Sequence, residues 1–182
     1  MTFKTFLSTA TAIALGTAVY AANPTVGGAP MLVERNIIEN AVNSPVHTTL
    51  VAAVKAADLV DTLQGPGPFT VFAPVNDAFA ALPAGTVETL LMPENKAMLQ
   101  KVLTAHVVAG DWSAADIIAA ARASKDGFYH FNAVSGDALS AQVKGNNVYI
   151  LDESGNAARV TVADVDQSNG VIHVINAVLV PK

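Results

Sequence analysis

The most informative stretch of this sequence covers residues 70–79 and reads Thr70-Val71-Phe72-Ala73-Pro74-Val75-Asn76-Asp77-Ala78-Phe79. Its β-branched and aromatic first half predicts a short strand over residues 69–72, which Pro74 closes because proline cannot donate to a strand ladder. Asn76 or Asp77 is well placed to cap a brief helix behind the strand. The stretch therefore predicts a strand that leads directly into a short helix.

An amphipathic helix is predicted upstream of this stretch. Ser44 and Pro45 have the chemistry of an N-cap and of a first helical residue. Apolar residues then recur at helical spacing as far as Leu63, and Gly65-Pro66 supplies a stop signal. The apolar face of this helix is expected to belong to the core.

More helices are predicted downstream. Residues 87–91 and 98–103 keep the helical spacing of apolar side chains, and Pro93 marks a break between two helices. A third helix begins at Ser113, where Ser113 and Asp116 have the spacing of a capping box.

The second half of the chain has the pattern of β structure. From Phe128 onward, apolar and polar residues alternate, and the turn residues 145–147 separate two predicted strands of a hairpin. The last predicted strand, residues 171–180, is apolar except for His173 and Asn176. A run of this kind is expected of a strand that is buried on both faces.

Three segments of the chain resemble the signature boxes of fasciclin-like domains, and they occur in the family's order. They are residues 70–79, residues 103–110 (Leu-Thr-Ala-His-Val-Val-Ala-Gly) and residues 169–181 (Asn-Gly-Val-Ile-His-Val-Ile-Asn-Ala-Val-Leu-Val-Pro). The resemblance covers residues from about 34 to 181, and we take residues 34–182 as one fasciclin-like domain. It implies an α+β fold in which several helices pack around a seven-stranded β-wedge or sandwich.

Two positions depart from the family pattern. Ala105 stands where the family typically has a tyrosine, to which integrin binding is credited in animal members, so that function does not transfer to this chain. Asn176 replaces the usual aspartate, which keeps one acceptor oxygen but loses a charge.

The N-terminus has the pattern of a cleavable export signal. Lys4 precedes an apolar stretch from Phe6 to Val19, and small residues follow. We expect residues 1–21 to be a signal peptide and the Gly- and Pro-rich residues 22–33 to be a flexible lead-in. The rival interpretation, a membrane anchor, needs about 20 apolar residues and is weakened by the threonines here. The protein is therefore expected to be secreted or periplasmic, with no membrane insertion after cleavage.

Composition and charge exclude several classes of function. The chain has no cysteine, which removes disulfide exchange, thiolate metal ligands and cysteine nucleophiles. Removing residues 1–21 takes away Lys4, the segment's only charge, so the formal net charge goes from −5 to −6. Nucleic acids and anionic membranes usually bind clustered Lys and Arg, and the sequence has no such cluster. Neither is therefore an expected partner. We expect a monomer that needs no cofactor.

The polar residues of the boxes provide both structural and binding candidates. We favour structural roles for four of these residues. His106 is expected to be a hydrogen-bonded core histidine, and Asn76 and Asp77 are expected to be helix caps. Asn176 is expected to bond to backbone groups beside it. Trp112 either anchors the third helix or presents an indole for contact. The structural candidates are Thr70, Phe72, His106, His173 and Asn176. The binding candidates are Pro74, Asn76, Asp77, Phe79, His106 and Trp112.

The resemblance favours an adhesion or binding module that contacts a protein or glycan at a cell surface, and not an enzyme. The recognised hydrolase and phosphate-binding motifs are absent from the sequence, and the four histidines lack the spacing of a metal site. One alternative is a carrier of a small apolar molecule in a pocket between the helices and the wedge, lined by residues 90–103. A weaker alternative is a hydrolase with a Ser-His-Asp site assembled across the fold.

Overall fold

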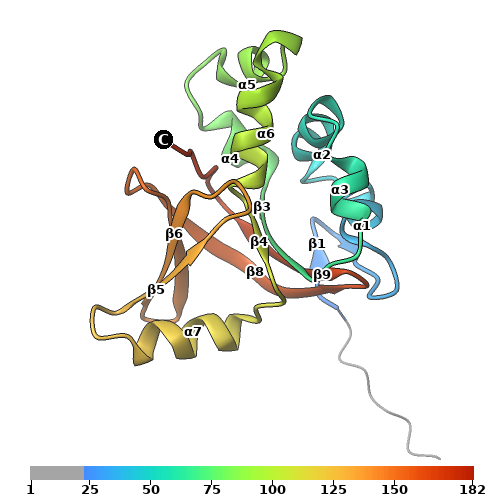
Figure 1. The fold of residues 1–182 in the computed structure, drawn as a ribbon. Helices are drawn as coiled ribbons and strands as arrows, with labels where there is room; N and C mark the ends of the chain where they lie inside the picture. Colours follow the sequence, from blue (N-terminus) through green and yellow to red (C-terminus); the bar gives the residue numbers. More distant parts are fainter. Residues whose placement is uncertain (1–22) are drawn as a thin grey trace, which may run out of the picture.

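A computed structural model describes residues 23–182, and its centre is a seven-stranded sheet in the order β4-β3-β9-β8-β7-β6-β5 (Figure 1). Strands β3 and β9 run parallel, and the other neighbours are antiparallel. The strands are β3 (Phe69–Pro74), β4 (Val107–Ala109), β5 (Phe128–Asn132), β6 (Ala138–Lys144), β7 (Asn147–Leu151), β8 (Ala157–Gln167) and β9 (Gly170–Ile175).

Strand β8 gives the sheet its wedge shape. Its first residues pair with β7, and residues 160–167 pair with β9, so that β8 belongs to both halves of the sheet. The register shifts twice between Val160 and Val165, and Asp164 has a positive φ of 54°. Bulges of this kind bend a strand and increase its twist. The sheet therefore folds over on itself and encloses a core between its two halves.

Strands β3 and β9 are buried on both faces, which the sequence pattern predicted for the last strand alone. In β3, Val71 and Ala73 pack on the helical side, whereas Phe72 points into the wedge. The same alternation in β9 places Val174 on the helical side and Ile175 in the wedge. Since successive side chains of a strand point to opposite faces, these two strands join the two cores of the domain.

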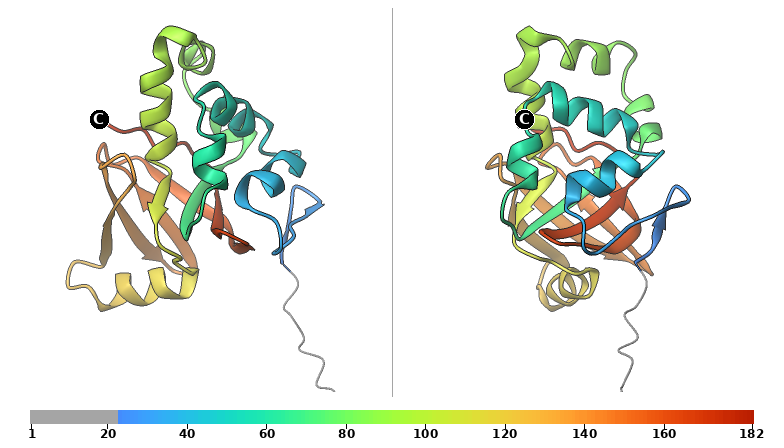
Figure 2. Two further views of the ribbon diagram at one scale, coloured as in Figure 1. Left: turned by 45° about the vertical axis from the view of Figure 1, so that its right-hand side comes forward. Right: turned by 90° about the vertical axis from the view of Figure 1, so that its right-hand side faces the viewer.

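Helices cover the sheet in two places, at the open end of the wedge and on the outer face of β3 and β9 (Figures 1 and 2). Helix α7 packs against β5 and β6 and closes the wedge, whereas the other helices lie on the far side of β3 and β9. This arrangement confirms the predicted α+β fold. The helices are α1 (Ile37–Asn43), α2 (Thr48–Ala56), α3 (Val60–Gln64), α4 (Asn76–Ala80), α5 (Thr86–Leu90), α6 (Lys96–Thr104) and α7 (Ala114–Ala123), with a 3-10 turn at Pro93–Asn95 before α6.

The helix predicted to start at Ser44 is two shorter helices, α2 and α3, separated by Asp58 with a φ of 54°. The predicted cap was also wrong. The Ser44 hydroxyl contacts Nδ1 of His47 at 2.9 Å, and Ser44 lies four residues before Thr48, the first residue of α2. By contrast, the capping box of Ser113 and Asp116 at the start of α7 is confirmed.

Residues 23–33, expected to be a flexible lead-in, form a short hairpin of β1 (Thr25–Val26) and β2 (Ala29–Pro30). Val26 and Met31 are buried in the helical core, and this burial holds the segment on the domain. The expected signal peptide, residues 1–21, lies outside the described residues. From residue 23 onward, no helix is long and apolar enough to cross a membrane.

Candidate binding surface

The first box places its four binding candidates in different environments. Pro74 and Phe79 are buried, so they shape the surface from below and offer little area to a partner. Asn76 is half-buried, and Asp77 is exposed on the first turn of α4. Asp77 is therefore the residue of this group that is most accessible to a partner.

Asn76 is occupied by a structural task. Its Oδ1 accepts hydrogen bonds from the Thr49 backbone N–H at 3.0 Å and from the Thr48 hydroxyl at 3.2 Å, and its Nδ2 donates to Pro45 O at 3.1 Å. Asn76 thus caps α2 from a distant part of the chain, because His47 at the N-cap position makes no side-chain bond to the helix. The predicted cap of α4 is absent, since Val75 holds that N-cap position without a side-chain bond.

An open groove of about 400 Å³ lies between α4 and α5. Its lining combines apolar side chains with two exposed carboxylates, Asp77 and Glu88. The volume falls within the usual range of ligand sites. The residues that line the groove are Thr49, Asn76, Asp77, Phe79, Ala80, Leu82, Pro83, Ala84, Gly85, Val87 and Glu88.

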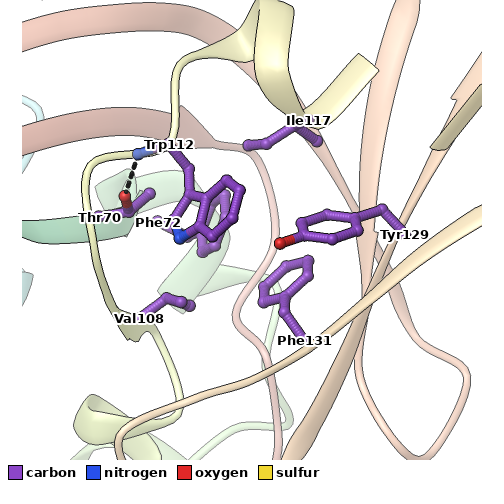
Figure 3. Close-up of a pocket in the computed structure, with 7 residues that line it drawn as sticks. All are labelled: Thr70, Phe72, Val108, Trp112, Ile117, Tyr129 and Phe131. Atoms are coloured by element: carbon purple, nitrogen blue, oxygen red, sulfur yellow. Dashed lines mark hydrogen bonds between the residues drawn. The ribbon is translucent and has the colours of Figure 1, made fainter. Parts of the chain in front are cut away.

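The second candidate region is the junction between β4 and α7, which Thr70 holds in place (Figure 3). The buried Thr70 hydroxyl donates to Gly110 O at 2.8 Å and accepts from the Trp112 backbone N–H at 2.9 Å. Gly110 has a φ of +109°, and a Cβ there would lie 2.8 Å from the indole nitrogen of Trp112. The junction therefore requires glycine for both conformation and space.

Trp112 is partly buried at the outer end of a row of aromatic rings (Figure 3). The row runs from Trp112 to Tyr129 (5.4 Å between centroids), Phe131 (5.3 Å) and the buried Phe72 (5.9 Å). These rings leave essentially no free volume between them. Partial burial also raises the pKa of Tyr129, because the phenolate would lose hydration. Trp112 is thus largely an anchor of the wedge.

His106 fixes the C-terminal segment to α6 from inside the core. Its Nδ1 donates to Val102 O at 2.8 Å, and its Nε2 accepts the Leu179 backbone N–H at 2.9 Å. This arrangement requires the neutral imidazole, since a protonated Nε2 would face another N–H. Burial lowers the pKa of His106 to about 4, although the Val102 carbonyl and the nearby Asp152 oppose the shift.

His173 links β9 to the Trp112 junction in a similar way. It is buried, its Nδ1 accepts the Asp164 backbone N–H at 3.3 Å, and its Nε2 donates to Trp112 O at 2.8 Å. Its ring stacks on Phe72, with 5.7 Å between the centroids. Burial lowers its pKa in spite of the Trp112 carbonyl and the surrounding aspartates. His106 and His173 therefore hold the scaffold in their neutral forms.

Comparison with known proteins identifies the family. The Fasciclin domain profile matches residues 45–181. The chain belongs to the fasciclin-domain family. It is 54% identical to protein sll1483 of Synechocystis over 145 residues, which are 80% of this chain and 73% of that protein. It is 32% identical to the cell surface glycolipoprotein MPB83 of Mycobacterium bovis over 180 residues, which are 93% of this chain and 72% of that protein.

The fold of this fasciclin domain matches a solved structure, a FAS1 domain pair from the insect cell adhesion molecule fasciclin I. The TM-score is 0.68 at 18% sequence identity, and the match covers 80% of this chain and 50% of that chain. The chain thus spans about half the length of that domain pair.

The two positions at which this chain departs from the fasciclin pattern, Ala105 and Asn176, differ in burial. Ala105 is buried at the C-terminal end of α6, with 1% of its surface exposed. Asn176 is exposed, and its Oδ1 accepts the Arg159 backbone N–H at 2.8 Å where β9 ends. In this chain, position 176 joins β9 to the start of β8.

A hydrogen-bonded Ser-His-Asp arrangement, which the sequence pattern did not single out, lies at strands β5 and β6 of this fasciclin domain. Ser140 Oγ contacts His130 Nδ1 at 2.8 Å, and His130 Nε2 contacts Asp126 Oδ2 at 2.8 Å. The Ser124 hydroxyl, His130 and the Phe128 N–H lower the pKa of Asp126. The His130 and Asp126 side chains are 62% and 53% exposed. Catalytic triads act in sites from which water is excluded. These exposed side chains therefore fit a surface hydrogen-bond network better than the active site of a hydrolase.

No metal site emerges within residues 23–182, where no three His, Asp or Glu side chains are placed to share an ion. The residues that sequence reasoning missed lie mainly around α5. Glu88 belongs to no recognised motif. It lines the same groove as Asp77 only because the chain turns back between α4 and α5. Tyr129 was also missed, because its partner Trp112 lies in a different element.

Proposed function

We propose that this chain is an exported adhesion or binding module that contacts a protein or glycan at a cell surface through the groove between α4 and α5. The observation that carries the proposal is the open groove of about 400 Å³ that the family's first box builds with α5. The names of two similar proteins, a cell surface glycolipoprotein and a cell adhesion molecule, support the same location and task. In this proposal, the protein works as a monomer and is not an enzyme.

The groove has the composition of a recognition surface. Leu82 and Val87 provide apolar area, and Asp77 and Glu88 place two carboxylates on the accessible rim. Apolar area at the centre and charge at the edge are typical of protein contact sites. Carboxylates accept hydrogen bonds from the hydroxyls of a glycan or from Lys and Arg of a protein. We favour a protein partner with basic side chains, because the mature chain has a formal net charge of −6.

Adhesion requires that the protein leave the cytoplasm, and residues 1–21 provide the proposed signal. Expression in the source cell, fractionation and N-terminal sequencing test this step. We expect a mature chain that begins at residue 22 in the periplasmic or extracellular fraction. An intact N-terminus in the cytoplasmic fraction would contradict the proposed export.

Binding to extracted cell-surface material and to a glycan array tests the adhesion proposal. We expect saturable binding that falls at least tenfold in a folded Asp77→Ala, Glu88→Ala double variant. A matched control is Asp61→Ala with Glu94→Ala, which removes the same charge from exposed positions that do not line the groove. Equal losses in both double variants would indicate nonspecific charge effects and would reject the groove. Absence of binding to every material would reject adhesion.

A further inference from the structure

A second groove, of about 560 Å³, lies on the other side of α5, between α5, α6 and the C-terminal segment. That segment runs beside α6 after β9 ends (Figures 1 and 2). The volume is within the usual range for small-molecule sites, about 300–1,000 Å³. Most of the lining is apolar: Leu82, Leu90, Met98, Val102, Val178 and Val180.

Part of the apolar lining is accessible to solvent. Met98 is 62% exposed and Val180 is 40% exposed, and both line the groove. Single exposed apolar residues are common on proteins, but several that face one hollow mark an interaction site. Methionine is unbranched and flexible, so Met98 can adapt to the shape of an apolar ligand.

The wall formed by the C-terminal segment is held in place before any ligand arrives. The Leu179 N–H donates to His106 Nε2 at 2.9 Å, and the Val180 N–H donates to Asp152 Oδ2 at 3.0 Å. Lys101 Nζ donates to the Lys182 backbone oxygen. A preformed wall lowers the entropic cost of binding, because little of the protein must be ordered.

The charged residues that line this groove are both lysines, Lys101 and Lys182. Asp137 lies 3.4 Å from Lys101 and offsets part of this positive charge. In a chain with a formal net charge of −5, an apolar groove lined by basic and not acidic side chains is a local exception. It complements a ligand with a long apolar body and one negative group.

We propose that this groove binds a long-chain fatty acid, with the aliphatic chain along the α5–α6 wall and the carboxylate beside Lys101 and Lys182. The proposal goes beyond adhesion, because it uses a different face of α5 and a different chemistry. A fatty acid also suits an exported domain, since its apolar chain needs a carrier in water. Failure of the adhesion tests would leave this proposal intact, and the reverse is also true.

Displacement of fluorescent parinaric acid by palmitate from the delipidated protein tests the proposal. We expect saturable binding at one site and a loss of about tenfold or more in Met98→Glu, which places a negative charge in the apolar groove and repels the carboxylate. Met92→Glu is the matched control, because Met92 is 45% exposed and does not line the groove. Absence of saturable binding, or equal losses in both variants, would overturn the proposal.

The carboxylate is tested separately with hexadecanol, which has the same number of carbon atoms as palmitate and no charge. A Lys101→Gln, Lys182→Gln double variant is expected to weaken palmitate binding several-fold and to leave hexadecanol binding unchanged. If the double variant binds palmitate as tightly as the original protein, the groove does not select a carboxylate, and the fatty acid proposal is overturned.

Discussion

The wedge of this fasciclin domain and its helical cap, which is formed by α1–α6 on the other face of β3 and β9, share these two strands but are closed in different ways. Inside the wedge, the rings from Trp112 to Phe72 leave no room for a water molecule, and the buried hydroxyl of Thr70 fixes the adjoining loop. In the cap, two grooves of about 400 and 560 Å³ lie on the two sides of α5. The wedge is therefore the closed half of the domain, and the helical cap is the half with open grooves on its surface.

The lengths of the elements explain this division. Helices α4 and α5 have five residues each, and neither has a side-chain N-cap bond. Helices this short are not stable alone and depend on packing. No residue of α5 is fully buried, so this helix packs only loosely and leaves hollows on both sides. The wedge strands β5, β6 and β7, by contrast, pair along uninterrupted ladders.

The largest expected difference between the two halves concerns core truncation. Phe72→Ala in the wedge is expected to lower the free energy of unfolding by about 3–5 kcal/mol, because it opens a cavity in a closed core. Leu90→Ala in the cap should cost about 1 kcal/mol or less, because Leu90 is only partly buried beside an open groove. Urea unfolding measures both values. Equal costs would refute the comparison.

The second prediction concerns acid. Burial lowers the pKa of His106 from 6.5 to about 4, so between these pH values the unfolded chain binds a proton that the folded chain does not. The free energy of unfolding should therefore fall as the pH drops from about 6.5 to 4, by up to about 3 kcal/mol from His106. Below pH 4 this contribution levels off.

The matched variant for this test is His106→Gln, which removes the titration and keeps an acceptor for the Leu179 N–H. We expect lower stability at pH 7 but a smaller loss between pH 6.5 and 4, measured by urea unfolding at each pH. Some slope should remain, because burial also lowers the pKa of His47 and of His173. An unchanged slope would contradict the assignment, and His130→Gln serves as an exposed control.

Whether a structural feature could be predicted from the sequence depends on how far apart its residues lie along the chain. The capping box of Ser113 and Asp116 was predictable because both partners lie within one helical turn. The cap that Asn76 provides for α2 was not, because it accepts from Thr49, 27 residues away in sequence. The three family boxes identified the fold because they fix the shared strands. They also hold Asn76, Asp77 and Phe79, which line the first groove, whereas the remaining walls of both grooves depend on how α5 packs.

The third prediction concerns the Thr70 clamp. Thr70→Val keeps the shape of the side chain but leaves the Gly110 carbonyl and the Trp112 N–H without their partner. Because unpaired buried polar groups are costly, we expect a loss of about 2 kcal/mol in the free energy of unfolding. Thr89→Val, at an exposed position of α5, is the matched control and should change stability by less than about 0.5 kcal/mol. Similar values for the two variants would mean that the clamp adds nothing.

The smallest expected effect concerns Trp112, the only tryptophan of the chain, which reports on the wedge alone. Acrylamide should quench its emission less in the folded than in the unfolded protein, because its indole is partly buried and its Nε1 donates to Ala109 O at 3.3 Å. Asp77→Ala and Met98→Glu lie in the cap and should leave this quenching unchanged. If either variant raises it to the unfolded level, the cap controls the packing of the wedge, and the two halves are not independent.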